Sequence, residues 1–168
     1  MAIICKSPAE LDKMYRAGLV VWDVLSSLRA MVAPGVSTMD LEKFAERRTA
    51  EHRARPAFKG YRGFPCVLCT SVNNEIVHGI PSAARKLKDG EIVSLDFGVQ
   101  LDGYYGDAAV TVPVGKIAPE LEKLLRVTRE ARDYSMEELL ERLAELRGSA
   151  AAGTAGAQEG ANQPSQVH

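Results

Sequence analysis

A β-hairpin is encoded between residues 91 and 112, in the stretch EIVSLDFGVQLDGYYGDAAVTV. Two runs of alternating apolar residues flank the dipeptide Asp102-Gly103. This pair favours a two-residue type I′ turn, because both central residues of that turn need a positive φ. Leu101 then pairs with Tyr104, and this first pair sets the register of the whole hairpin. The sequence therefore predicts two antiparallel strands joined at Asp102-Gly103.

The predicted register brings two aspartates, Asp96 and Asp107, to one face of the hairpin. Asp107 lies opposite Gly98 and one diagonal step from Asp96, and strand side chains alternate with a period of two. Diagonal neighbours are roughly 7 to 8 Å apart at Cα, a gap that two carboxylates span by converging on a metal ion. Gly98 has no side chain and should leave room between them. Facing inward among apolar residues, the pair needs a cation or a proton; facing outward, it is a solvated pair of strand residues.

Length and composition indicate one soluble globular domain. The chain has 168 residues, of which 46% are hydrophobic, and its net charge of −1 argues against bulk affinity for nucleic acid or membranes. Basic residues nevertheless cluster in the first half, at Arg47, Arg48, Arg53, Arg55, Lys59 and Arg62. Such a cluster is most often a solvated helix face and loop, and contact with an acidic surface such as ribosomal RNA is the alternative.

Cysteine use and the N-terminus indicate a reducing compartment. No basic-then-apolar leader is present and no apolar run approaches the ~20 residues of a membrane span, so we expect a cytoplasmic protein. Three cysteines, an odd number, argue against a disulfide framework. Cys66 and Cys69 form a CxxC, but the segment around them is typical of a strand, in which positions i and i+3 point to opposite faces. We therefore expect neither a zinc site nor a redox pair there.

Two helices are expected before residue 55. Ser7, Pro8 and Glu10 supply an N-cap, a proline at the first helical position and a capping-box glutamate. The apolar stripe of this helix is expected at Leu11, Met14, Gly18, Val21, Leu25, Leu28 and Val32. A second helix begins at a cap formed by Ser37 or Thr38. Its inward side is expected at Leu41, Phe44 and Ala45.

A loop and a second, shorter hairpin are expected between these helices and the long hairpin. Residues 55–65 contain two prolines and two glycines, so they are predicted to be irregular. Their aromatic anchors are Phe58, Tyr61 and Phe64. An Asn-Asn turn would join strands at 67–72 and 75–77. His78 follows directly, and a histidine at a strand end is more often bonded to a backbone carbonyl than catalytic.

The sequence after the long hairpin predicts helices over residues 119–131 and 135–147. Residues 148–168 are rich in Ala, Gly, Gln and Ser and have almost no bulky apolar side chain. A segment of this composition buries too little apolar surface to order itself, so it is predicted to be disordered. The fold class expected for the whole chain is α+β, an antiparallel sheet with hairpins covered by helices.

Three motifs together resemble a known family. They are NEIVHGIP at residues 74–81, DFG at 96–98 and DGYYGD at 102–107. With these motifs, residues 1–131 look like the N-terminal half of a type I methionine aminopeptidase, an enzyme family of the pita-bread fold. The paired-aspartate hairpin alone is shared with proline-specific dipeptidases and creatinases. The NEIVHGIP run is the part that points to the methionine enzyme.

The resemblance implies roles for particular residues. Asp96 and Asp107 would ligate two divalent metal ions of cobalt, manganese, iron or zinc, with Asp107 bridging them. His78 would act catalytically, by hydrogen-bonding the substrate or the tetrahedral intermediate. The methionine side chain would lie against Tyr61, Phe64 and Cys69, because aromatic edges and a thiol suit a thioether. The implied partners are the N-termini of nascent polypeptides, with no part for membranes or specific DNA.

The same resemblance implies three further metal ligands, a histidine and two glutamates, from a second half of the fold. Residues 132–147 and 148–168 do not follow the family pattern, so we expect a chain truncated or frameshifted after about residue 131. Two carboxylates meet only part of the coordination that manganese, iron or cobalt prefers, and full activity is not expected. One alternative is a non-catalytic remnant that binds nascent chains, the ribosome or a complementary half. Another is half of a proline-specific dipeptidase.

Overall fold

An antiparallel sheet and two helices make up the first unit of the chain, which extends to Leu121. The computed structural model describes residues 5–130 and 138. The sheet is built around a long hairpin, and two shorter strands pair with the first arm of that hairpin. In chain order the elements are α1 (Pro8–Met31), α2 (Thr38–Glu51), β1 (Arg55–Pro56), a 3₁₀ helix (Tyr61–Gly63), β2 (Leu68–Val72), β3 (Ile92–Leu101) and β4 (Tyr104–Pro113).

The long hairpin has the register that its turn predicts. Leu101 of β3 lies opposite Tyr104 of β4. In the turn between them φ is +50° at Asp102 and +84° at Gly103, and positive values at both positions are what a type I′ turn requires. The turn sequence is therefore sufficient to fix which residues face each other along both strands.

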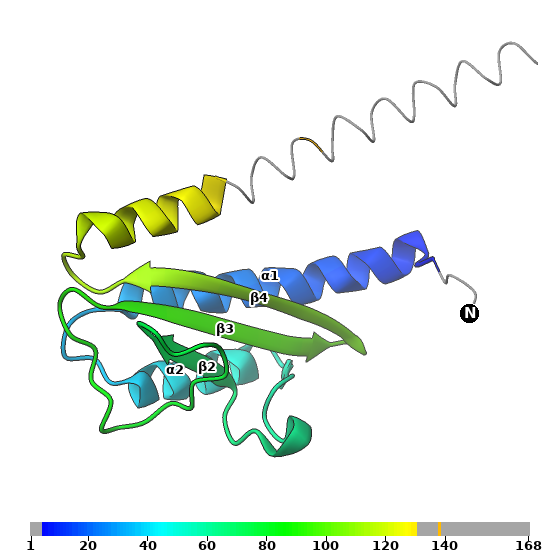
Figure 1. Ribbon diagram of the computed structural model, residues 1–168. Coiled ribbons are helices and arrows are strands. Elements are labelled where there is room, and N and C mark those ends of the chain that lie inside the picture. The colour runs from blue at the N-terminus through cyan, green and yellow to red at the C-terminus, as the bar shows by residue number, and fades with distance from the viewer. Residues whose placement is uncertain (1–4, 131–137, 139–168) are drawn as a thin grey trace, which may run out of the picture. The chain divides into compact units, whose positions relative to one another are not determined.

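Both helices cover one face of the sheet (Figure 1). Alternate residues of β3 point toward the helices and are fully buried, namely Val93, Leu95, Phe97 and Val99. They pack into one core with apolar residues of α1, α2 and β2. The intervening residues of β3, Asp96 among them, face the opposite side of the sheet. The α+β class and the antiparallel sheet are confirmed, and the sheet has one face left for a site.

Helix α1 begins as predicted and buries the later part of its predicted stripe, at Val21, Leu25 and Leu28. The Ser7 hydroxyl accepts a hydrogen bond from the Glu10 N–H, and the Glu10 carboxylate accepts one from the Ser7 N–H, which completes the capping box. The predicted stripe is wrong in the first turns, because Leu11 and Met14 are exposed. The hairpin ends beside this part of the helix, where Arg16 pairs with Asp102 in the turn. Burial begins further along, at Ala17, Val20, Val21, Val24, Leu25 and Leu28.

Helix α2 begins at Ser37, one of the two caps that the sequence offers. The Ser37 hydroxyl accepts a hydrogen bond from the Asp40 N–H. Leu41 and Ala45 are fully buried, as predicted, and Phe44 is half-buried against the core.

The second predicted hairpin is wrong. The Asn-Asn turn forms after β2, but residues 75–77 do not return as a strand. Strand β2 has β3 on one side, and its other edge is already occupied. There the N–H groups of Leu68, Thr70 and Val72 donate, in turn, to the Glu42 carboxylate, the Gly79 carbonyl and the Glu75 carboxylate, at 2.8–2.9 Å. Two side chains and one carbonyl thus replace the partner strand that the sequence pattern predicts.

The second unit begins at Glu122. Residues 119–130 are helical, in agreement with the helix predicted over 119–131. The helix predicted over 135–147 lies outside the described residues except for Glu138, and the tail predicted over 148–168 lies outside them entirely. The domain boundaries placed near residues 131 and 147 stay predictions. Within the described part of the chain, no helix combines the length and the apolar character needed to cross a bilayer.

Candidate active site

A pocket of about 840 Å³ involves the sheet face that the helices leave free. Its lining includes all six residues singled out from the sequence, namely Tyr61, Phe64, Cys69, His78, Asp96 and Asp107. These residues come from the 3₁₀ region, from β2, from the loop after β2 and from both arms of the long hairpin. The fold therefore brings together groups that are up to 46 positions apart in the sequence, counted from Tyr61 to Asp107.

The two aspartates share one face, as the hairpin register predicts. Asp96 lies opposite Ala109 in the β3–β4 ladder, and Asp107 lies opposite Gly98, so the carboxylates are diagonal neighbours. Burial and then the negative charge of Asp107 raise the pKa of the Asp96 carboxyl, whereas the nearby His78 lowers it. Asp96 is half-buried and Asp107 is exposed, so only Asp96 departs from the alternative of two freely solvated carboxylates.

Gly98 does not leave the gap between the carboxylates that its missing side chain suggests. A Cβ built on Gly98 would lie 2.8 Å from Cε1 of Phe58 and 3.3 Å from the Cβ of Ala57. The space is therefore filled by the loop that follows β1, and Phe58 and Ala57 both line the pocket. The Phe58 ring packs against the sheet at Gly98, where there is no side chain in its way. Sequence reasoning missed this contact because the two residues are 40 positions apart.

The apolar end of the pocket is aromatic and contains a thiol. Phe64 is half-buried, whereas Tyr61 is 65% exposed and lies toward the open side. Cys69 is buried directly opposite Asp96, and burial followed by the charges of Asp96 and Asp107 raises the pKa of its thiol to about 12. Burial also raises the pKa of Cys66. Both shifts oppose the direction that activates a redox thiol, and all three cysteines are free.

Further lining residues were not predicted as part of the site. They are Ala57, Phe58, Arg62, Gly63, Pro65, Ile80, Tyr105 and Gly106. Tyr105 could have been found from the sequence, because it lies two positions before Asp107 and strand residues at that spacing share a face. Arg62 carries the one permanently positive side chain of this lining, and its guanidinium lies 5.5 Å from the centroid of the Tyr61 ring.

His78 occupies an unusual backbone conformation at the pocket. Its φ is +53°, and that of Val77 is +49°. Positive φ is uncommon for any residue other than glycine and is an outlier for a β-branched valine. Such residues cost about 1–3 kcal/mol each and persist where surrounding contacts hold them. The structure thus places the imidazole in the pocket lining through a strained pair of residues rather than through a strand end.

The donor set of the pocket suits a hard divalent cation in part. Two carboxylates side by side supply oxygen ligands, which such ions prefer, and a cation would relieve their mutual repulsion. Among residues 5–130 and 138, however, no group of three or more His, Cys, Asp or Glu side chains is placed to hold a metal ion. Asp96 and Asp107 therefore supply two carboxylates whose chemistry fits a hard divalent cation.

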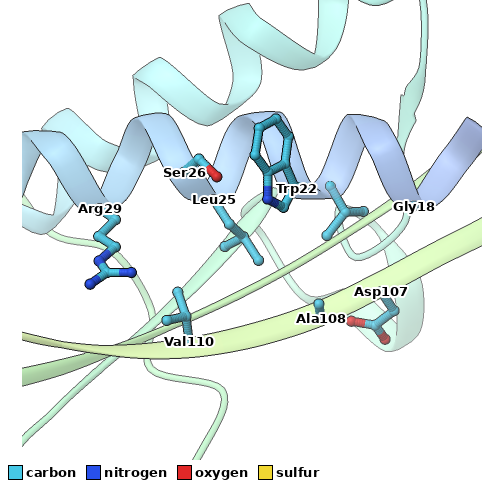
Figure 2. A pocket seen from close by; sticks show the side chains of 9 residues that line it. Gly18, Trp22, Leu25, Ser26, Arg29, Asp107, Ala108 and Val110 are labelled. Carbon is cyan, nitrogen blue, oxygen red and sulfur yellow. The ribbon is translucent and has the colours of Figure 1, made fainter.

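A second, smaller hollow of about 290 Å³ lies between α1 and β4. Figure 2 shows Trp22, Leu25 and Val110 around it, with Arg29 near one end and Asp107 near the other. Its lining is largely apolar, and Trp22 is 68% exposed. Asp107 is common to both hollows, and the larger one alone joins it to Asp96 and His78.

Half of the basic cluster is paired within the fold, since Arg47, Arg48 and Lys59 each contact a carboxylate. Arg48 contacts Asp23 at 2.7 Å and Glu51 at 2.9 Å. Lys59 contacts Glu46 at 2.5 Å. Arg53, Arg55 and Arg62 are exposed and form no ion pair with the described residues, so contact of this cluster with an acidic surface stays a prediction.

The chain is similar to known proteins in sequence and in structure. Residues 12–151 match the Metallopeptidase family M24. The chain belongs to metallopeptidase family M24. Among relatives of this M24 chain is methionine aminopeptidase 1 of Bacillus subtilis, 48% identical over 136 residues that cover 81% of the chain and 54% of the relative. The methionine aminopeptidase of Clostridium acetobutylicum is 46% identical over 129 residues, or 77% of the chain and 52% of the relative.

Solved structures agree with this assignment. The methionine aminopeptidase of Thermotoga maritima matches with a TM-score of 0.74 and 43% identity, over 77% of the M24 chain and 52% of the other. A Xaa-Pro dipeptidase from Bacillus anthracis, with a TM-score of 0.62 and 20% identity over 75% of this chain and 34% of the other, shows a shared fold alone. The pita-bread fold is confirmed. The chain spans about half the length of the curated relatives it matches.

Proposed function

We propose that the pocket is part of the active site of a methionine aminopeptidase, which removes the N-terminal methionine from nascent proteins in the cytoplasm. The observation that carries the proposal is the meeting of Asp96, Asp107 and His78 with an aromatic and thiol-lined end in one pocket. A volume of about 840 Å³ is within the usual range for small-ligand pockets and has room for a methionyl residue and the start of the next.

Asp96 and Asp107 would hold the divalent metal ions, and Asp107, at the more open position on β4, would bridge two of them. When bound, such ions lower the pKa of a water molecule and polarise the carbonyl of the peptide bond to be cut. The carboxylates would hold the ions on the sheet face. Because the two carboxylates lie on the two arms of the long hairpin, their separation is fixed by the strand register.

His78 would hydrogen-bond the substrate beside the scissile bond. Its imidazole lines the same pocket as both carboxylates, and its presence lowers the pKa of Asp96. A catalytic hydrogen-bonding group must lie within reach of the reacting atoms, which the strained backbone of Val77 and His78 makes possible.

Methionine specificity would come from Tyr61, Phe64 and Cys69. A thioether makes favourable contacts with aromatic edges and is itself soft and polarizable, like the thiol. The raised pKa of Cys69, about 12, keeps this thiol neutral at physiological pH, so the wall it forms stays apolar. A polar or charged side chain of the substrate would lose its hydration against the aromatic rings and the thiol.

Turnover by these 168 residues alone is expected to be low. Manganese, iron and cobalt prefer five or six ligands. The lining of the pocket offers two carboxylates, those of Asp96 and Asp107. We therefore propose that the site described here binds metal weakly and recognises methionine. Full activity would need the three ligands that the family resemblance implies.

A peptide titration tests this proposal. The chain in zinc, which is diamagnetic, would receive a peptide that begins Met-Gly, and NMR shifts would be followed at Tyr61, Phe64 and Cys69, together with release of free methionine. Shifts at these residues, absent with a peptide that begins Glu-Gly, are expected to accompany slow release or none. Shifts of the same size with the Glu-Gly peptide or with a Xaa-Pro dipeptide would overturn methionine specificity. Rapid release would overturn only the expected low turnover.

A further inference from the structure

The segment that carries His78 is attached to β2 through the residue that follows it. Gly79 donates its backbone N–H to the hydroxyl of Ser71, at 3.1 Å. Its carbonyl accepts the N–H of Thr70, at 2.8 Å. Both polar groups of this one peptide position are therefore held by two neighbouring residues of the sheet.

Gly79 lies too close to β2 for any side chain. A Cβ at this position would be 2.1 Å from the carbonyl oxygen of Thr70 and 3.0 Å from the Cα of Ser71. Both atoms belong to the backbone of a strand and cannot swing aside. The close approach is what brings the Gly79 N–H within reach of a side chain as short as serine.

The attachment has a geometric effect on the pocket. His78 and Ile80 stand on either side of Gly79, and both line the pocket. Just before Gly79, two consecutive residues, Val77 and His78, have positive φ. A free loop would relax from this conformation, so the contacts that fix Gly79 also hold the imidazole where it is.

Ser71 itself is not part of the pocket. It is 5% exposed, it is absent from the pocket lining, and its contact with the loop is the hydrogen bond to Gly79. The serine lies two positions from Cys69 on β2, and its cross-strand partner is Ser94 of β3. Any influence of Ser71 on the site must therefore pass through the backbone of Gly79.

We propose that Ser71 is a positioning residue for His78. Its hydroxyl accepts the Gly79 N–H and thereby holds Val77 and His78 in the left-handed conformation that presents the imidazole to the two aspartates. This inference rests on the proposed function for its meaning, since it concerns how the proposed substrate-binding histidine is aimed. It can nevertheless be tested without metal or substrate.

The test compares Ser71→Ala with wild type by NMR on the metal-free chain. Loss of one hydrogen bond is expected to raise the exchange rate of the Gly79 amide about three- to tenfold. The one-bond Cα–Hα couplings of Val77 and His78, which report the sign of φ, are expected to move toward values for negative φ. The chemical shifts of the His78 imidazole are expected to change with them. Ser71→Thr keeps the hydroxyl and should restore the wild-type signature.

Ser94→Ala is the matched control, because it removes a hydroxyl from the same face of the neighbouring strand and among the described residues no hydrogen bond to that hydroxyl is present. If Ser71→Ala does not fold, Ser71→Cys replaces it, since a thiol of similar size accepts hydrogen bonds only weakly. Unchanged Val77 and His78 couplings and unchanged imidazole shifts in a folded Ser71 variant would overturn the proposal. The same changes in Ser94→Ala would also overturn it. A failure of manganese to bind would count against the proposed function and leave this result standing.

Discussion

Asp96 and Asp107 leave the same face of the β3–β4 hairpin as diagonal neighbours, because Gly98 and not Asp96 stands opposite Asp107. This register keeps the two carboxylates close enough to repel each other without placing them in direct cross-strand contact. The charge of Asp107 is one cause of the raised pKa of Asp96. The pair is therefore a cost to the metal-free fold and an advantage when a cation is present.

Asp107→Asn is expected to stabilise the metal-free chain slightly. Removing one of two neighbouring like charges should raise the free energy of unfolding by about 0.5 kcal/mol at pH 7. Urea denaturation in the presence of a chelator measures this. Asp12→Asn, at an exposed position 4.0 Å from Arg16, is the control and should not stabilise. A destabilised Asp107→Asn variant would show that the carboxylate repulsion is already relieved in the metal-free chain.

Gly98→Ala is expected to disturb the pocket. The new Cβ would lie 2.8 Å from the Phe58 ring, so the ring must move away from the strand. Overpacking of this kind costs about 1–3 kcal/mol. Thermal unfolding measures the loss, and NMR shifts of Phe58 and Phe64 report the pocket. An unfolding midpoint equal to that of wild type, with unchanged Phe58 shifts, would contradict the packing of Phe58 against Gly98.

Gly106→Ala and Gly18→Ala are expected to act in opposite directions at the same interface between α1 and β4. A Cβ at Gly106 would lie 2.7 Å from the backbone carbon of Ala17, which cannot yield, so a loss of about 2–4 kcal/mol is expected. A Cβ at Gly18 meets nothing within 4 Å, and alanine should gain about 0.5–1 kcal/mol from its helix propensity. Denaturant titration of both variants checks the signs. Equal effects would contradict the close approach of β4 to α1.

The acid side of the stability curve is expected to depend on Asp23. Hydrogen bonds from Arg48 and then His52 lower the pKa of this carboxyl from 3.8, although burial opposes them. A depressed folded-state pKa stabilises the fold above 3.8, and the effect disappears as the pH falls through the folded-state value. Asp23→Asn should therefore lower the free energy of unfolding by about 1 kcal/mol at pH 7. The effect is this small because the Asp23–Arg48 pair is partly exposed. The difference from wild type should shrink as the pH falls below 3.8 and vanish only below the lowered folded-state pKa. A difference that persists there would contradict the ion pair as its cause.

How far the sequence predicts this structure depends on how local the determining contact is. Asp102-Gly103 fixes the hairpin register and hence the relation of Asp96 to Asp107, since both follow from one turn. The family resemblance assigned one site to His78, Tyr61, Phe64 and Cys69. All four side chains line the same pocket, and their roles stay predictions.

What the sequence did not predict are contacts between distant segments. Residues 75–77 have the pattern of a strand, but the Glu42 and Glu75 carboxylates and the Gly79 carbonyl already occupy the edge of β2. Phe58 lies over Gly98, a contact that no local pattern encodes. In both cases the competing partner comes from another part of the chain, so periodicity and turn propensity alone give the wrong answer.

Calorimetric titration of the metal-free chain with manganese tests the central claim, that Asp96 and Asp107 together form a metal site. Wild type is expected to bind manganese, and Asp96→Asn and Asp107→Asn should each weaken the affinity at least about tenfold. Asp12→Asn should bind as wild type does. Equal affinity in wild type and both site variants, or no binding to wild type at millimolar manganese, would contradict the account.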